Sequence, residues 1–479
     1  MSEDALIAAE SLPYLGLFVA LAVICAVLYV RNASVTAVQT SPEFKAFQWD
    51  YLAVYWTMQF ADWLQGPYIY ALYGARGFTQ GQIGILFVAG FGSALILGTF
   101  IGSLADKTGR RLNCLAFAVV YSVSCMLTHS ESFELLIVGR ILGGIAGSIL
   151  NTAFEAWMVS EHNSRGFNGA WLGSTFSFAI FGSGVAAISA GLVAAPLVSR
   201  FGVTAPFDLS AIVLCIGAGV VLLRWNENYG SRSEGDGPTS TMASFTRAIG
   251  VLTSNGRVVA VGATQSLFEA AMYIFVFYWT PTLESSLAAD ESAAAAAAGT
   301  PPLPEGAVAP ASSLPHGIVF AAFMVSVMIG SKMFESFSAS APVEQWGLWV
   351  FLLASAALAT PVFVSHHWTQ VVALCVFEGC CGVYFPLIAV LRGKYIPEDV
   401  RSTLMNLFRV GLNIIVLLVL GRADELGGTA SFALCATLLA AAMAPQAMLR
   451  NASEVAEAAK DDDGTDGAAE DDSADVRHT

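Results

Sequence analysis

Five charged residues stand inside long apolar stretches of this 479-residue sequence. Three are acids, Asp62, Glu269 and Glu378, and two are bases, Arg140 and Arg409. Each lies about seven to twelve residues into its stretch, which at about 1.5 Å per helical residue places it near the middle of a membrane-spanning helix. A charge at that depth costs free energy and indicates a function by default.

Two kinds of chemistry fit these residues. Arg140 and Arg409 could bind a tetrahedral oxyanion, because a guanidinium group offers forked N–H donors. Asp62, Glu269 and Glu378 could take up and release protons as their surroundings change. The structural alternative is that the charges only fix helix packing, with Arg140 paired to Asp62, and Arg409 paired to Glu269 or Glu378. The residue types leave both interpretations open.

Polar and aromatic residues cluster around Asp62 in the string DWLQGPYIY. Gly66 and Pro67 are expected to break or kink the helix and to free carbonyl groups beside Gln65 and Tyr68. A broken helix next to a charge favours a binding site, although a kink can also serve packing alone. We therefore predict that Gln65 and Tyr68 join Asp62, Arg140 and Arg409 in binding the substrate.

A second polar group lies in the stretch GSLADKTGRR, between two apolar segments. Hydrocarbon tolerates neither charges nor unpaired backbone, so the stretch is expected to form a loop at the membrane surface. Its three bases place that surface in the cytoplasm. An acid near the cytoplasmic end of a later segment, Glu155, is expected to pair with Arg110 or Arg111. The predicted cytoplasmic gate consists of Gly102, Asp106, Gly109, Arg110, Arg111 and Glu155.

The composition indicates the class of protein in which these charges occur. Hydrophobic residues make up 56% of the chain and charged residues 12%, against about 25% charged in soluble domains. This balance predicts an all-α polytopic membrane protein. The eight cysteines are scattered and have no metal-ligand spacing. No nucleophile–base pair or phosphate loop appears, so we expect no enzyme, metal site, cofactor or nucleic-acid partner.

Thirteen apolar segments are long enough to span about 30 Å of hydrocarbon. The first, near residues 13–30, is interpreted as an anchor helix ahead of a twelve-helix core. With GSLADKTGRR in the cytoplasm, only Arg76, Arg200 and Arg422 among the loop bases fall on the other side. This asymmetry predicts an N-terminus outside and a C-terminus in the cytoplasm.

The segments divide the chain into five parts. They are an anchor helix and linker (1–45), a six-helix half (46–224), a cytoplasmic linker (225–256), a second six-helix half (257–449) with an extracellular low-complexity insert (284–314), and a disordered acidic cytoplasmic tail (450–479). Weak internal matches, such as Gly102-Ser103 and Gly330-Ser331, indicate that the two halves are related.

The stretch GSLADKTGRR resembles the signature loop of the major facilitator superfamily, Gly-x-Leu-Ala-Asp-x-x-Gly-Arg-Arg/Lys. A narrower resemblance rests on seven strings: ADWLQGPYIYALY (61–73), LADKTGRR (104–111), VGRILGG (138–144), AFEAWMVSEH (153–162), WNENY (225–229), QSLFEAAMYIFVFYWTP (265–281) and YFPLIAVLRGKYIPE (384–398). Together they resemble the molybdate-anion transporter family.

The resemblance implies the major facilitator fold, with two pseudo-symmetric six-helix halves. Core helices one, four, seven and ten, which carry Asp62, Arg140, Glu269 and Glu378, would line its central cavity. It also implies high-affinity uptake of molybdate at the plasma membrane, with tungstate and sulfate as expected competitors. The five intramembrane charges sum to -1 when ionised, which does not suit a dianion, so we expect at least one protonated acid and proton-coupled import.

Two alternatives remain at this point. The same fold could carry another small anion or an organic solute, since Trp63, Tyr68, Tyr70 and Tyr73 suit organic ligands. Alternatively, the protein is a membrane sensor or scaffold that does not transport, and its acidic tail binds a partner.

Overall fold

The structure, a computed structural model, describes residues 3–31, 40–229, 238–298, 314–338 and 340–466. These residues form helices and turns, without a strand. The helices are α1 (Glu3–Arg31), α2 (Pro42–Trp63), α3 (Ile69–Ala75), α4 (Gln80–Thr108), α5 (Arg110–Leu127), α6 (Phe133–Leu150), α7 (Ala153–Ser164), η1 (Gly169–Trp171), α8 (Leu172–Phe201), α9 (Ala205–Arg224), α10 (Pro238–Ser254), α11 (Gly256–Ala297), α12 (His316–Phe337), α13 (Val343–Phe363), α14 (His367–Tyr395), η2 (Glu398–Val400), α15 (Arg401–Leu420) and α16 (Ala423–Asp466).

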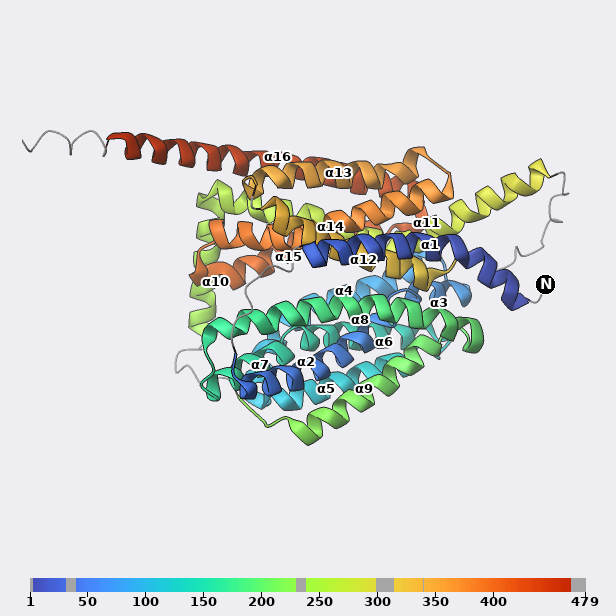
Figure 1. Cartoon of the computed structure of the whole chain (residues 1–479), viewed down its shortest axis with the longest axis horizontal. Coiled ribbons are helices and arrows are strands. Elements are labelled where there is room, and N and C mark those ends of the chain that lie inside the picture. The colour runs from blue at the N-terminus through green and yellow to red at the C-terminus, as the bar shows by residue number, and fades with distance from the viewer. Residues whose placement is uncertain (1–2, 32–39, 230–237, 299–313, 339, 467–479) are drawn as a thin grey trace, which may run out of the picture.

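The helices form two halves that lie side by side (Figure 1). One half contains α2 to α9, and the other contains α11 to α16. Twelve helical stretches among the described residues are long and apolar enough to cross a membrane. The stretch α2–α3 is not among these twelve, because α2 carries several polar residues, but α2 packs against α8 and α9 inside the first half. The protein is therefore a multi-pass membrane protein.

The anchor helix α1 precedes the first half in sequence but packs against α12 of the second half. Near its start, the Tyr14 hydroxyl lies 2.6 Å from Nε2 of His367. Near its end, the Lys332 ammonium lies 4.5 Å from the centre of the Tyr29 ring. The Tyr29 ring also packs on Phe181 of α8 at 5.2 Å. Helix α1 thus covers the seam where α8 and α12 meet.

The first core helix is broken, as the sequence predicted. Helix α2 ends at Trp63, residues 64–68 form turns, and α3 begins at Ile69. Close packing accompanies this break, because a Cβ on Gly66 would lie 3.2 Å from the Phe320 ring of α12. The turn therefore lies against the second half.

Three segments contain more helix than expected. Helix α11 continues through residues 284–297 of the predicted insert, and α16 continues through 450–466 of the predicted tail. The linker 225–256 contains α10, which packs on α15 and η2. The extensions of α11 and α16 are rich in Ala and Glu, which favour helix although these segments lack apolar bulk. Residues 299–313 and 467–479 lie outside the described part of the chain.

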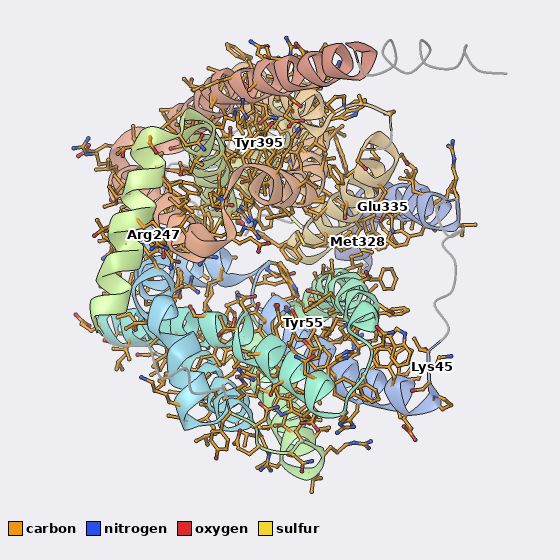
Figure 2. All side chains as sticks on the ribbon, turned by 90° about the vertical axis from the view of Figure 1, so that its left-hand side faces the viewer. Lys45, Tyr55, Arg247, Met328, Glu335 and Tyr395 are labelled. Atoms are coloured by element: carbon orange, nitrogen blue, oxygen red, sulfur yellow. The ribbon has the colours of Figure 1, made fainter. Side chains whose placement is uncertain are left out.

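We name the two ends of the bundle the Gly109 end and the Asp424 end, after residues that lie there. Figure 2 looks onto the Gly109 end, with Arg247 of α10 and Tyr395 on the side of the second half and Tyr55 in the first half. Contacts between the halves concentrate towards the Asp424 end, where α4 meets α15 and α16, and where the end of α8 meets the start of α12.

Aromatic rings close the interface towards the Asp424 end. The Phe277 ring of α11 lies 5.3 Å from both the Phe87 ring of α4 and the Tyr70 ring of α3. The Tyr273 ring meets the Phe91 ring at 4.7 Å. Offset and edge-on contacts of this kind add about 0.5–1.5 kcal/mol per pair beyond their buried area. This layer separates the interior between the halves from the Asp424 end.

Candidate functional site

The predicted first-half residues come together around α2, α5 and α6. The Tyr121 hydroxyl donates a hydrogen bond of 2.6 Å to Oδ1 of Asp62. The Arg140 guanidinium interacts electrostatically with Asp62, but no direct ion pair within 4.0 Å joins the two described side chains. Arg140 instead lies over the Phe87 ring at 5.2 Å, with its Nε 3.4 Å from the Leu86 carbonyl. The two opposite charges compensate each other at a distance.

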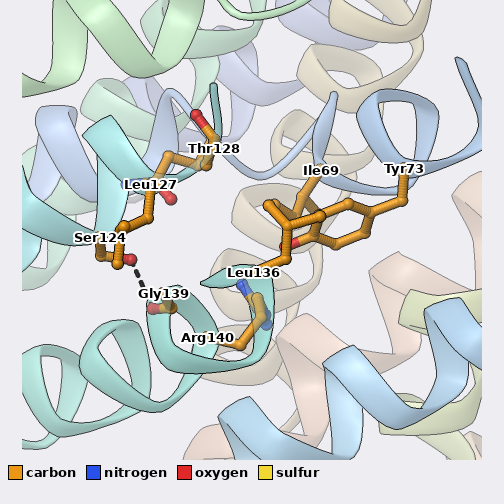
Figure 3. A pocket seen from close by; sticks show the side chains of 9 residues that line it. Ile69, Tyr73, Ser124, Leu127, Thr128, Leu136, Gly139 and Arg140 are labelled. Atoms are coloured by element: carbon orange, nitrogen blue, oxygen red, sulfur yellow. Dashed lines mark hydrogen bonds between the residues drawn. The ribbon is translucent and has the colours of Figure 1, made fainter. Parts of the chain in front are cut away.

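A small pocket lies beside this group (Figure 3). Gln65, Ile69, Tyr73, Ser124, Leu127, Thr128, Leu136, Gly139 and Arg140 line it. The space open to the centre of a water molecule is about 10 Å³, enough for about one water. Gln65 is buried and its Nε2 lies 3.2 Å from Sγ of Cys125. In this conformation the first-half pocket is too small for a tetrahedral oxyanion.

Tyr68 lies apart from that pocket. Its buried ring packs against the His316 ring at 5.5 Å, and it interacts with the backbone of Gly317. His316 and Gly317 begin α12, so Tyr68 contacts the second half rather than Asp62. The structure thus brings Asp62, Gln65 and Arg140 together and places Tyr68 at the junction of the halves.

The second half holds a connected polar group that includes Glu269. Its Oε1 accepts hydrogen bonds from the Tyr384 hydroxyl at 3.1 Å and from Nη2 of Arg392 at 3.3 Å. Nε of Arg392 donates to Oε1 of Gln265 at 3.1 Å, and Nε2 of Gln265 donates to Glu269 at 3.4 Å. Stacking on Phe268 at 3.9 Å fixes the Tyr384 ring. Glu269 is therefore an ion-paired carboxylate.

Arg409 and Glu378 have no such partners. Arg409 of α15 is exposed, and its guanidinium makes no hydrogen bond or ion pair with the described residues. It interacts electrostatically with Glu269 and Tyr273. Glu378 of α14 is 9% exposed, and its carboxyl group likewise has no hydrogen-bond or ion-pair partner in the described part of the chain. Neither charged group is therefore compensated by a direct contact within the described residues.

Sequence reasoning missed Arg392. The positive-inside rule counts it among the cytoplasmic loop bases, at the end of the apolar segment near residues 368–392. Helix α14 instead extends over 29 residues, and Arg392 pairs there with Glu269. The only signal was the length of this apolar segment, which exceeds the roughly 20 residues a span requires. Because Arg392 pairs with Glu269, the five predicted charges and Arg392 together sum to zero instead of -1. The charge argument for a protonated acid is therefore weaker than the sequence suggested.

The signature stretch is mostly helical rather than a ten-residue loop. Helix α4 runs to Thr108 and α5 begins at Arg110, so Gly109 is the only residue between them. Its φ of +109° suits glycine, and a Cβ there would lie 2.6 Å from Cδ of Glu227. Leu, Ala and Lys favour helix, which carries α4 beyond the apolar segment. The burial of Gly102 and the side chain of Asp106 lie outside what the structure describes.

Glu227 is a residue at the corner between α4 and α5 that the sequence did not single out. Its carboxylate accepts the backbone N–H groups of Arg111 at 2.8 Å and Leu112 at 3.1 Å, at the N-terminus of α5. An anion is favoured there, because the first N–H groups of a helix lack partners within it. Nη2 of Arg111 donates to the Leu222 carbonyl at 2.8 Å. The corner between α4 and α5 is thereby tied to the segment that follows α9.

Arg110 and Glu155 line one pocket at the Gly109 end, with a volume of about 730 Å³. Asn151, Thr152, Ala156, Val159, Ser160, Asn163 and Tyr229 complete its walls. The predicted pairing of Glu155 with Arg110 therefore concerns residues that do share a surface, although the structure describes no ion pair of Glu155.

Comparisons with known proteins agree with this architecture. A family profile described as sugar transporters with 12 transmembrane segments matches residues 13–297 and 298–380. The solved structure of the nucleoside transporter NupG superimposes with a TM-score of 0.63 at 13% identity, covering 85% of this chain and 98% of NupG. At that identity the likeness concerns the fold alone, which is the major facilitator fold.

Two relatives found by sequence are more similar to this chain than NupG is. The molybdate-anion transporter of Xenopus tropicalis is 33% identical over 438 residues, covering 87% of this chain and 89% of the relative. That of Danio rerio is 32% identical over 469 residues, covering 89% and 92%. These relatives are transporters rather than enzymes. The chain belongs to the molybdate-anion transporter family, a branch of the major facilitator superfamily.

Proposed function

We propose that this protein imports molybdate by alternating access between its two halves. The observation that carries the proposal is the exposed, unpartnered guanidinium of Arg409 inside a bundle whose full-length relatives are named molybdate-anion transporters. An unpaired guanidinium is costly inside a membrane protein unless an anion visits it. Its forked donors match the oxygens of a tetrahedral dianion. Tungstate and sulfate share this geometry and should compete.

We propose further that the Gly109 end faces the cytoplasm and that the protein works at the plasma membrane, with its N-terminus outside. The asymmetric distribution of loop bases supports this orientation. The contacts between the halves then close the outer side, and the conformation described here is the one open towards the cytoplasm. The corner at Gly109 with Glu227, Arg111 and the pocket of Arg110 and Glu155 would change partners when that side closes.

For proton coupling, Glu378 is the acid we propose. Arg392 compensates the charge of Glu269, and Tyr121 and Arg140 stabilise that of Asp62. Glu378 has no partner of this kind among the described residues. Asp62, Gln65, Tyr68 and Arg140 would then act in the first half, by shaping the pocket and the junction with α12 rather than by holding the anion in this conformation.

Uptake at nanomolar molybdate, in cells that lack their own carrier, tests the function. Wild-type protein should accumulate molybdenum, and Arg409→Gln should abolish uptake at unchanged surface expression. Arg200→Gln is the matched control, because Arg200 is also an exposed intrahelical arginine but lies at the end of α8. Full uptake by Arg409→Gln would show that Arg409 does not bind the substrate. Absence of molybdate uptake by the wild-type protein would refute molybdate as the substrate.

A neutral sugar is the second candidate, because the matching family profile is described as sugar transporters. Sugars are recognised by aromatic rings and neutral polar groups, and an unpaired arginine gains little from them. Competition by monosaccharides against labelled molybdate separates the two: sugars should leave uptake unchanged, whereas tungstate should reduce it.

A further inference from the structure

Arg392 retains donors after its internal bonds are made. Its Nε donates to Gln265 and its Nη2 to Glu269, while its Nη1 has no partner among the described residues. The side chain is 24% exposed. A guanidinium presents several N–H groups in a fixed fork, so Arg392 can donate to an anion without releasing either partner.

Arg409 lies close to the same carboxylate from the neighbouring helix. The Ser266 hydroxyl donates to the Phe408 carbonyl at 2.9 Å, which fixes α11 against α15 one turn away from Glu269. Arg409 follows Phe408 directly and interacts electrostatically with Glu269 and Tyr273. Arg392 thus contacts Glu269 directly, and Arg409 on α15 lies within electrostatic range of the same carboxylate.

The charges favour this half over the first. With Glu378 protonated, as the proposed coupling requires, Arg392, Arg409 and Glu269 leave the second half with a formal charge of +1, whereas Asp62 and Arg140 cancel. A dianion gains from the positive group and finds no net charge in the first half. Space points the same way, because the pocket of Arg140 holds about one water. Arg409, by contrast, is exposed.

We infer that the oxyanion is held within the second half, by Arg392 together with Arg409, and that Glu269 and Gln265 are positioning residues that aim Arg392. This inference rests on the proposed function and refines its site. Arg140, which the sequence predicted to bind the anion as well as Arg409, is then not an anion ligand in this conformation.

The test measures KM and the maximal rate of molybdate uptake, normalised to surface protein, for variants of the pair. Arg392→Gln should raise KM about 10- to 100-fold, the equivalent of one charge-assisted contact. Arg392→Lys should recover only part of this, because Lys keeps the charge without the fork. If Arg392→Gln fails to reach the membrane, Arg392→Lys provides the KM measurement in its place. The double variant Glu161→Gln with Arg165→Gln is the matched control, because it removes another Arg–Glu ion pair at the Gly109 end.

The double variant Glu269→Gln with Arg392→Gln decides between ligand and structural pair. If Arg392 serves only to neutralise Glu269, removing both charges restores wild-type KM, and that result would overturn the inference. If Arg392 binds the anion, KM stays raised in the double variant. Glu269→Gln alone should keep KM at or below the wild-type value, because its amide oxygen can still accept the hydrogen bond that aims Arg392, while its negative charge is removed. Loss of molybdate uptake by the wild type itself would refute the proposed function instead, so the two failures are distinguishable.

Discussion

Asp424, at the start of α16, fastens the second half to the first. Its Oδ1 accepts the backbone N–H of Gly81 at 2.6 Å, and its Oδ2 accepts the Thr79 hydroxyl at 3.2 Å. Thr79 and Gly81 begin α4, whose first N–H groups lack partners within the helix and carry partial positive charge. Asp424→Ala removes both hydrogen bonds and the charge, so the Asp424 end should open more readily.

The magnitude follows from these contacts. A hydrogen bond to a charged group contributes about 1.5–3 kcal/mol, and a charge at a helix terminus adds about 0.3–1 kcal/mol. The contact is exposed to solvent, so we take the low end of both ranges, about 2 kcal/mol in total. At about 1.4 kcal/mol per factor of ten, Asp424→Ala should shift the closed-to-open equilibrium about 30-fold towards opening. Asp424→Asn keeps acceptors without the charge and should give a smaller shift.

Electron–electron resonance between spin labels measures this equilibrium. Labels at Glu131→Cys and Thr429→Cys, both exposed near the Asp424 end, report the separation of the halves there, after Cys215→Ser removes the exposed native thiol. Asp424→Ala should populate a longer distance, and Glu425→Gln, which removes the neighbouring exposed acid, should not. An unchanged distance distribution for Asp424→Ala would refute the role of this carboxylate as a latch.

Two further predictions concern Glu378, the acid proposed for proton coupling, and Gly109, at the corner between α4 and α5. Glu378→Gln should make molybdate uptake insensitive to external pH and to a protonophore, whereas wild-type uptake should rise as the external pH falls; retained pH dependence in the variant would exclude Glu378. Gly109→Ala should lower the melting temperature of the purified protein more than Gly166→Ala does. Both sites have positive φ, which costs an L-residue about 1–2 kcal/mol, but only at Gly109 would the new Cβ meet Glu227. Equal losses would contradict the packing argument.

The sequence alone determined the membrane class, the helical fold and the break in the first core helix. Each of these follows from a local property. Long apolar segments must cross hydrocarbon as helices, because their backbone groups find no water there. The dipeptide Gly66-Pro67 interrupts the helical hydrogen bonds wherever it stands. The family could also be predicted from short strings of residues, because comparing strings does not require knowing which side chains are in contact.

The site depended on the tertiary structure. Asp62 and Arg140 share a group as predicted, but Glu269 pairs with Arg392, which the sequence had placed in a loop. The anchor helix α1 packs on the second half although it precedes the first. Glu227 stands more than 100 residues from the N-terminus of α5, whose N–H groups it binds. Pairings of this kind depend on which helices become neighbours and how they are rotated about their axes. The spacing of apolar residues along one helix does not indicate which helix it packs against.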